Sequence, residues 1–198
     1  MRSTTSSGIS IRSSTLAAAG TATASTGFEG FAGTSTLRPR ASIGQRLNVL
    51  ITGPTGVGKS FLACALAQAA CRRDYSVRFF RLPRLVDELT RHHALQNRSG
   101  LLKQLAKAEL LVLDDFGLMP FSEQTRRDLL EILDDRYDRR STIVTSQLPV
   151  DQWHTYLNDP TLADAILDRL VHNSYRLVLK GESMRKQKTV ETRTADRP

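Results

Sequence analysis

The chain has 198 residues, of which 40% are hydrophobic, enough for one α/β core and too few for two. Its formal net charge of +8 permits a nucleic-acid partner without requiring one, because a solvated basic surface gives the same charge. The sequence contains no apolar run close to the roughly 18–20 residues that a membrane-spanning helix needs, which excludes a membrane protein and predicts a soluble, cytoplasmic one.

The first 45 residues are rich in serine, threonine, alanine and glycine and lack hydrophobic periodicity. Such a segment cannot bury enough apolar area to offset the entropy lost on ordering, so residues 1–45 are predicted to be disordered. An organellar transit peptide has a similar composition, but the amphipathic pattern that would support this alternative is missing. Residues 186–198 are predicted to be a polar tail, which leaves 46–185 as the folded domain.

From residue 46 onward, apolar runs typical of strands alternate with helical patterns. Strands are predicted at 47–52, 76–81, 110–113, 142–145 and 175–180. Helices are predicted at 61–71, 84–96, 100–106, 122–137 and 162–172, with a further short helix ending before Pro160. This alternation predicts an α/β fold with a five-stranded, mainly parallel sheet flanked by helices, right-handed crossovers, and little or no C-terminal lid.

A complete phosphate-binding loop lies between the first predicted strand and the first predicted helix. Its sequence is GPTGVGKS, contributed by Gly53, Pro54, Thr55, Gly56, Val57, Gly58, Lys59 and Ser60. Strand, glycine loop and helix in this order form the setting in which the motif binds a nucleoside triphosphate, and an incidental glycine turn is the disfavoured alternative.

Each part of this loop has a chemical reason. Glycines let backbone N–H groups turn toward an anion without Cβ clashes, and the helix N-terminus adds partial positive charge. We expect Lys59 to neutralise the β- and γ-phosphates and the Ser60 hydroxyl to complete the coordination of Mg²⁺.

Two carboxylates follow the apolar run at 110–113. Asp114 and Asp115 would lie at the C-terminal end of a strand buried on both faces, at the edge where open α/β sheets bind ligands. Asp114 is predicted to hold Mg²⁺ directly or through water, and Asp115 to orient or deprotonate the attacking water. A solvated Asp-Asp turn is the alternative. Many such ATPases have Glu at the second position, so the shorter Asp115 predicts slow intrinsic turnover.

Three further polar residues are candidates for the site. Gln147 follows the strand at 142–145 and would sense phosphate or position water, unless it caps the next helix. Arg169 is expected to face outward beside Asp168, as either a finger toward a neighbour's nucleotide or a surface salt bridge. Arg185 would return to the phosphates or belong to a basic C-terminus.

Residues 46–188 resemble the IstB-type helper ATPases of bacterial insertion sequences, relatives of the DnaC and DnaI helicase loaders in the AAA+ class. The matching stretches occur in order: NVLITGPTGVGKS at 48–60, LLVLDDFG at 110–117, RRSTIVTSQLPVDQWH at 139–154, ADAILDRLVHNSYR at 163–176 and GESMRK at 181–186. This combination is far more specific than a phosphate loop alone.

The resemblance implies a P-loop NTPase of AAA+ type whose cofactors are ATP and Mg²⁺. It implies that Asp114 and Asp115 form the Walker B pair, that Gln147 is the first sensor and that Arg169 is a finger acting in trans. Arg185 matches the terminal arginine of the family. It also implies a homo-oligomer on DNA, with nucleotide at subunit interfaces, that recruits or stimulates a transposase.

Three interpretations of function remain open. A transposition helper that binds the DNA backbone, in duplex form and without sequence specificity, is favoured over a helicase loader that binds single strands. The third is a truncated ATP-binding fragment without assembly, because residues 1–45 do not match the helical segment that precedes the core in the family. Candidate DNA contacts, each with a solvated surface as its alternative, are Arg72, Arg73, Lys103, Arg139 and Arg140.

Overall fold

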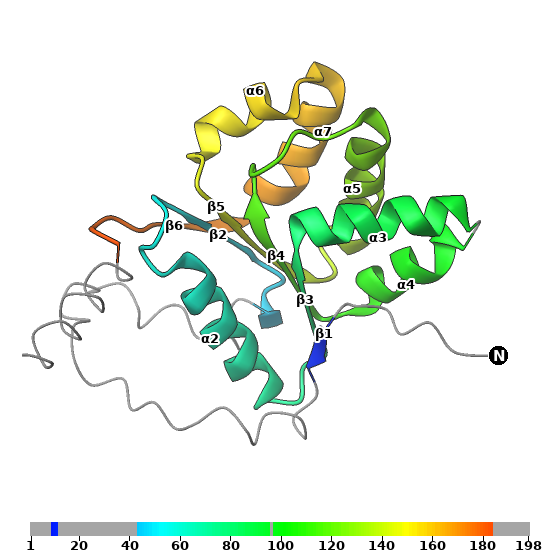
Figure 1. Ribbon diagram of the computed structural model, residues 1–198. Coiled ribbons are helices and arrows are strands. Elements are labelled where there is room, and N and C mark those ends of the chain that lie inside the picture. The colour runs from blue at the N-terminus through cyan, green and yellow to red at the C-terminus, as the bar shows by residue number, and fades with distance from the viewer. Residues whose placement is uncertain (1–8, 12–42, 96, 184–198) are drawn as a thin grey trace, which may run out of the picture.

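A six-stranded sheet forms the centre of the structure, a computed structural model that describes residues 9–11, 43–95 and 97–183 (Figure 1). The strands are β1 (Ile9–Ile11), β2 (Asn48–Thr52), β3 (Val77–Arg81), β4 (Leu110–Phe116), β5 (Ser141–Ser146) and β6 (Ser174–Val178). Their spatial order is β1-β3-β4-β5-β2-β6. Strands β2 to β6 pair in parallel, which confirms the predicted five-stranded parallel sheet.

Helices cover both faces of this sheet (Figure 1). They are α2 (Lys59–Cys71), α3 (Leu82–Ala94), α4 (Arg98–Lys107), α5 (Glu123–Arg136), the 3₁₀ helix η3 (Val150–Gln152), α6 (Trp153–Leu157) and α7 (Pro160–Val171). Helix α2 packs on one face, and α3 to α7 pack on the other. None of the helices among the described residues combines the length and the hydrophobicity needed to cross a bilayer.

Alternation along the central strands divides the core into two layers. Val49 and Ile51 of β2 pack on the side of α2, whereas Leu50 packs with the helices of the opposite face. All three side chains are at most 3% exposed, as expected of a parallel strand with helices on both faces. Strand β2 is buried along its whole length, and the phosphate loop begins at the residue that follows it.

The helix boundaries follow the local signals in the sequence. The Ser122 hydroxyl caps α5 by accepting a hydrogen bond from the Thr125 backbone N–H at 3.1 Å. The predicted break at Pro160 lies between α6 and α7, with the proline in the first turn of α7 and Asp159 as its cap. Trp153 is fully buried and packs on Phe116, with ring centroids 4.5 Å apart, which holds the segment after β5 against β4.

One element was not predicted. Ile9–Ile11 forms β1, which pairs antiparallel with β3 at the edge of the sheet, within the segment for which disorder was predicted. Three residues are too few to show a period-2 pattern, so β1 depends on its pairing with β3. Ile43 of the same segment is buried in the core on the side of α2. Residues 1–8 and 12–42, Arg185 and the predicted tail 186–198 lie outside the described residues.

Candidate nucleotide-binding site

The phosphate loop lies at the C-terminal edge of the parallel strands, between β2 and α2. Its glycines have the backbone angles that the motif requires, with φ of 146° at Gly53, 87° at Gly56 and 95° at Gly58. The helix begins earlier than predicted, so Lys59 and Ser60 occupy its first turn and Gly58 is its N-cap. The backbone N–H groups of that turn have no helical acceptor of their own, and they face the position where an anion would bind.

Lys59 is held against the loop by two hydrogen bonds. Its ammonium group donates to the Gly53 carbonyl at 2.8 Å and to the Pro54 carbonyl at 2.7 Å. The residue is only 7% exposed, and this burial lowers the pKa of its ammonium group, an effect that the charges of Asp115 and Asp114 oppose. A phosphate would give this buried charge a stronger partner than the loop carbonyls do.

Ser60 and Asp114 meet although 54 residues separate them in the chain. The Ser60 hydroxyl donates to Asp114 Oδ1 at 2.8 Å, and the Thr145 hydroxyl donates to the same oxygen at 2.5 Å. Asp114 is 4% exposed. The structure therefore brings together the two residues predicted to hold Mg²⁺, which prefers oxygen ligands and completes its shell with water and phosphate oxygens.

The two carboxylates lie in a bulge of β4. The pairing of β4 with β5 shifts register between Leu113 and Phe116, and Asp115 adopts the left-handed conformation, with φ of 65°. A bulge interrupts the regular alternation of side chains and commonly occurs beside active sites, where it re-aims a residue. Thr145 lies opposite and accepts a hydrogen bond from the Asp115 backbone N–H at 3.1 Å.

Arg81 forms an ion pair with the carboxylate of Asp115. Its Nε and Nη2 atoms donate to Asp115 Oδ2 at 2.9 and 2.5 Å. The hydrogen bond and the charge of Asp115 raise the pKa of the Arg81 guanidinium above its usual value. Arg81 ends β3 and lies opposite Asp114 in the register with β4, so its contact with the next residue, Asp115, depends on the bulge and was not predicted.

Gln147 contacts the phosphate loop. The Thr55 hydroxyl donates to Gln147 Oε1 at 2.8 Å, because β5 lies between β2 and β4. The alternative of a helix cap is not supported, since Pro149 is the N-cap of η3 and no side chain caps that helix. The sensor role itself stays a prediction.

Arg169 lies at the opposite edge of the sheet. The Asn48 side-chain amide donates to the Arg169 carbonyl at 2.8 Å, and Asn48 begins β2, whereas the phosphate loop follows the end of β2. A strand of five residues spans roughly 13 Å, so Arg169 cannot reach the loop of its own subunit. Its Nε atom donates to Asp134 at 2.6 Å, and its Nη1 atom lies 3.5 Å from Asp168. Arg169 therefore forms the surface salt bridge that was one of its two expected roles, and its action in trans stays a prediction.

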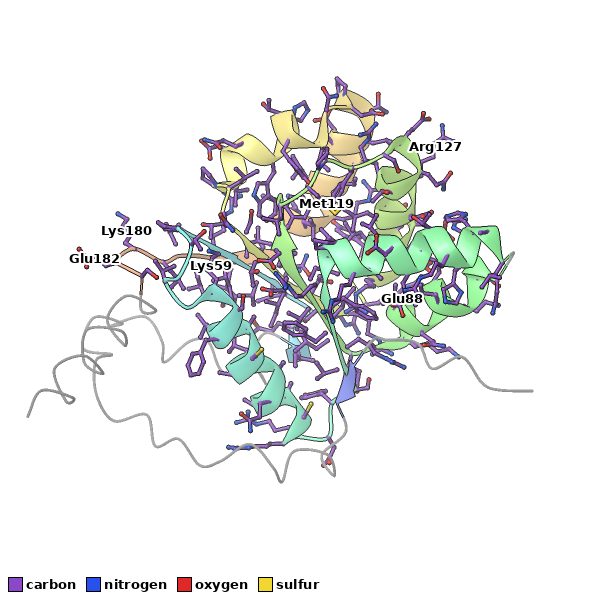
Figure 2. All side chains as sticks on the ribbon, viewed as in Figure 1. Lys59, Glu88, Met119, Arg127, Lys180 and Glu182 are labelled. Atoms are coloured by element: carbon purple, nitrogen blue, oxygen red, sulfur yellow. The ribbon has the colours of Figure 1, made fainter. Side chains whose placement is uncertain are left out.

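The segment after β6 closes over the phosphate loop, a feature that the sequence did not indicate. The Leu179 backbone N–H donates to the Thr52 carbonyl at 2.7 Å. A Cβ at Gly53 would overlap the Leu179 carbonyl, and one at Gly56 would overlap the Ser183 side chain. Figure 2 shows Lys180 of this segment on the same side of the molecule as Lys59.

This close approach predicts a strong effect of Gly56→Ala. We expect it to weaken nucleotide binding at least about tenfold, because the new methyl group displaces Ser183 and strains a backbone with φ of 87°, at a cost of roughly 1–3 kcal/mol. Titration with a fluorescent ATP analogue measures the affinity. Gly181→Ala is the matched control, because φ there is 125° but the new Cβ meets nothing within 4 Å. Equal losses in the two variants would show that backbone strain alone is responsible.

Comparison with known families and relatives gives a consistent result. The sequence model of a family described as "IstB-like ATP binding protein" matches residues 32–192. A protein of Sinorhizobium fredii with the provisional name insertion sequence ATP-binding protein y4pL is 57% identical over 139 residues, 70% of this chain and 57% of that protein. A provisionally named ATP-binding protein of insertion sequence IS21 from Pseudomonas aeruginosa is 38% identical over 138 residues, 70% of this chain and 52% of that protein. The chain thus spans just over half the length of these relatives.

Solved structures confirm the predicted fold. The DnaC helicase loader superposes with a TM-score of 0.61 at 23% identity, covering 74% of this chain and 89% of that one. DnaI superposes with a TM-score of 0.64 at 22% identity, covering 76% of this chain and 82% of that one. Identities this low establish the P-loop fold of AAA+ type and nothing about function.

Proposed function

The chain belongs to the IstB-like ATP-binding proteins, and from this premise we propose that it is an ATPase that assembles on DNA and assists a transposase in target selection or strand transfer. One observation carries the chemical part of the proposal. The phosphate loop places the Ser60 hydroxyl 2.8 Å from the buried carboxylate of Asp114, with Asp115 next in the chain. This arrangement suits a nucleoside triphosphate better than any other ligand class.

Each residue of the site has a role in this proposal. The loop amides and Lys59 bind the phosphates, and Lys59 exchanges its two loop carbonyls for phosphate oxygens. Mg²⁺, held by Ser60 and Asp114, would supply charge stabilisation at the phosphates. Asp115 orients or deprotonates the attacking water once its carboxylate leaves Arg81.

The role in transposition rests on the relatives. The names of both curated relatives place them in insertion sequences, and y4pL shares 57% of its matched residues with this chain, against 23% for the DnaC helicase loader. The helicase loader is the second candidate, because the fold is shared with DnaC and DnaI. The identities favour the transposition helper, in which DNA and a transposase are the partners.

The decisive experiment measures ATPase rates without DNA, with duplex DNA and with single-stranded DNA, while self-assembly is followed by light scattering. The proposal expects both hydrolysis and assembly to increase on duplex DNA. A preference for single strands would favour the helicase loader. ATP binding without any response to DNA would indicate a nucleotide-binding fragment that does not assemble.

Action of Arg169 in trans gives a separate prediction. Arg169→Ala is expected to leave ATP binding unchanged and to reduce DNA-stimulated hydrolysis at least about tenfold, because the guanidinium would stabilise charge on a neighbour's nucleotide. Mixing Arg169→Ala with Lys59→Ala subunits should restore part of the activity, since each supplies what the other lacks. Unchanged hydrolysis in Arg169→Ala would assign the residue to its salt bridge with Asp134 alone.

A further inference from the structure

A basic hollow lies at the edge of the sheet opposite the phosphate loop. It has a volume of about 510 Å³, and its lining includes the cations Arg46, Lys103, Lys107, Arg139 and Arg140. Helix α4 contributes the two lysines, the turn between α5 and β5 contributes Arg139 and Arg140, and Arg46 precedes β2. Since β2 and β5 both begin here, the hollow and the nucleotide site occupy opposite ends of the same parallel strands.

The charge of this hollow is not balanced. Asp135 is the one acid in the described lining, against five exposed cations. Some exposed arginines elsewhere are paired with a carboxylate, as Arg127 is with Glu123. Within the described part of the chain, none of the five hollow cations forms an ion pair with a carboxylate. The Arg46 guanidinium donates instead to the backbone carbonyl of Asp138, which carries no charge, at 2.8 Å.

A buried arginine adds to this positive field. Arg136 ends α5 and is 1% exposed. Its guanidinium donates to neutral acceptors, among them the Leu105 and Ala108 carbonyls at 2.7 Å each. Burial, and then the charge of Arg140, lower its pKa to about 9, so that it remains positive at neutral pH. Like charges gathered in this way repel one another, and a bound polyanion would offset that repulsion.

We propose that this hollow binds the sugar-phosphate backbone of duplex DNA. The inference rests on the proposed function, to which it adds the location of the DNA contact. Lysine and arginine side chains neutralise phosphates without reading sequence. The described lining contains no aromatic side chain on which the bases of a single strand would stack, which favours the duplex. DNA here would not compete with ATP, because the two ligands occupy opposite edges of the sheet.

The test uses two matched pairs of adjacent arginines. Arg139→Glu/Arg140→Glu reverses two charges of the hollow, and Arg72→Glu/Arg73→Glu makes the same change in net charge beyond the end of α2, outside the described lining. All four residues are exposed, so neither variant disturbs the core. Fluorescence anisotropy with labelled duplex and single-stranded DNA, in the presence of ATP and at several salt concentrations, measures affinity. ATP binding and self-association without DNA are measured in parallel.

We expect the hollow variant to bind duplex DNA about 10- to 100-fold more weakly, with ATP binding unchanged. The slope of log affinity against log salt concentration should fall by the amount that corresponds to roughly two phosphate contacts. The duplex affinity of the control variant should stay within about threefold of wild type, because its changed charges act on DNA only at long range and are screened by salt. Unchanged affinity of the hollow variant, or equal losses in both variants, overturns the hollow and leaves the proposed function intact. Weaker self-association without DNA assigns the hollow to a protein interface and overturns the proposal. A wild type that binds neither form of DNA overturns the proposed function as well.

Discussion

Lys59→Ala is expected to abolish ATP binding at micromolar nucleotide. Lys59 is the buried cation of the phosphate loop, and its ammonium group already makes two hydrogen bonds of 2.7–2.8 Å to loop carbonyls. Two charge-assisted bonds to phosphate, at about 1.5–3 kcal/mol each, amount to roughly 10²–10⁴-fold in affinity. Alanine also leaves the Gly53 and Pro54 carbonyls without this donor, so the loop loses part of its support. Isothermal titration calorimetry with ATP and Mg²⁺ measures the loss directly.

Lys180→Ala is the matched control for charge. Lys180 is an exposed lysine of the segment that closes over the loop, so its removal changes the net charge by the same amount near the same site. Affinity should then remain within a few-fold of wild type, since an exposed and screened charge contributes little. Circular dichroism of both variants confirms folding. Near-normal ATP binding by a folded Lys59→Ala protein would refute the assignment of the phosphate loop.

Features that depend on short stretches of chain could be predicted from the sequence. The glycines between 53 and 58 carry their own backbone requirement, and all three have positive φ. Ser122 caps α5, and Pro160 lies in the first turn of α7, because capping and proline geometry involve only neighbouring residues. The parallel sheet follows from the alternation of these local elements, so both the fold and the position of the phosphate loop could be predicted from the sequence.

Other contacts between distant residues, unlike that of Ser60 with Asp114, could not be predicted in the same way. Arg81 meets Asp115 across 34 residues, and the contact depends on the pairing of β3 with β4 and on a bulge in β4. The Asp134 partner of Arg169 comes from another helix, and it took the structure to show that Arg169 lies far from its own loop. Ser183 lies over Gly56 in the segment that follows β6. The position of β6 beside β2 has no local signal in the sequence, so this contact could not be predicted.

Asp115→Asn is expected to reduce ATP hydrolysis by about 10²–10⁴-fold without weakening ATP binding. The amide keeps the size of the side chain but cannot take a proton from water, and removal of a general base has an effect of this size. The binding groups are untouched, since Lys59, Ser60 and Asp114 contact one another or the loop rather than the Asp115 side chain. Phosphate release at saturating ATP measures the rate, and calorimetry measures the affinity. A rate within about threefold of wild type would remove Asp115 from catalysis.

Arg81→Ala is expected to raise the rate of ATP hydrolysis, in contrast to Asp115→Asn, which lowers it. Arg81 donates two hydrogen bonds to Asp115 Oδ2, the carboxylate that must face water during hydrolysis. Without the guanidinium, we expect DNA-independent hydrolysis to rise several-fold, since an exposed ion pair contributes only about 0–1 kcal/mol. Arg81→Lys, which keeps the charge but loses the two-point contact, should lie between wild type and Arg81→Ala. The double variant Arg81→Ala/Asp115→Asn tests whether the effect passes through Asp115. If it does, loss of Arg81 will not change the residual rate of Asp115→Asn, whereas an independent role of Arg81 at the nucleotide will change both rates by the same factor.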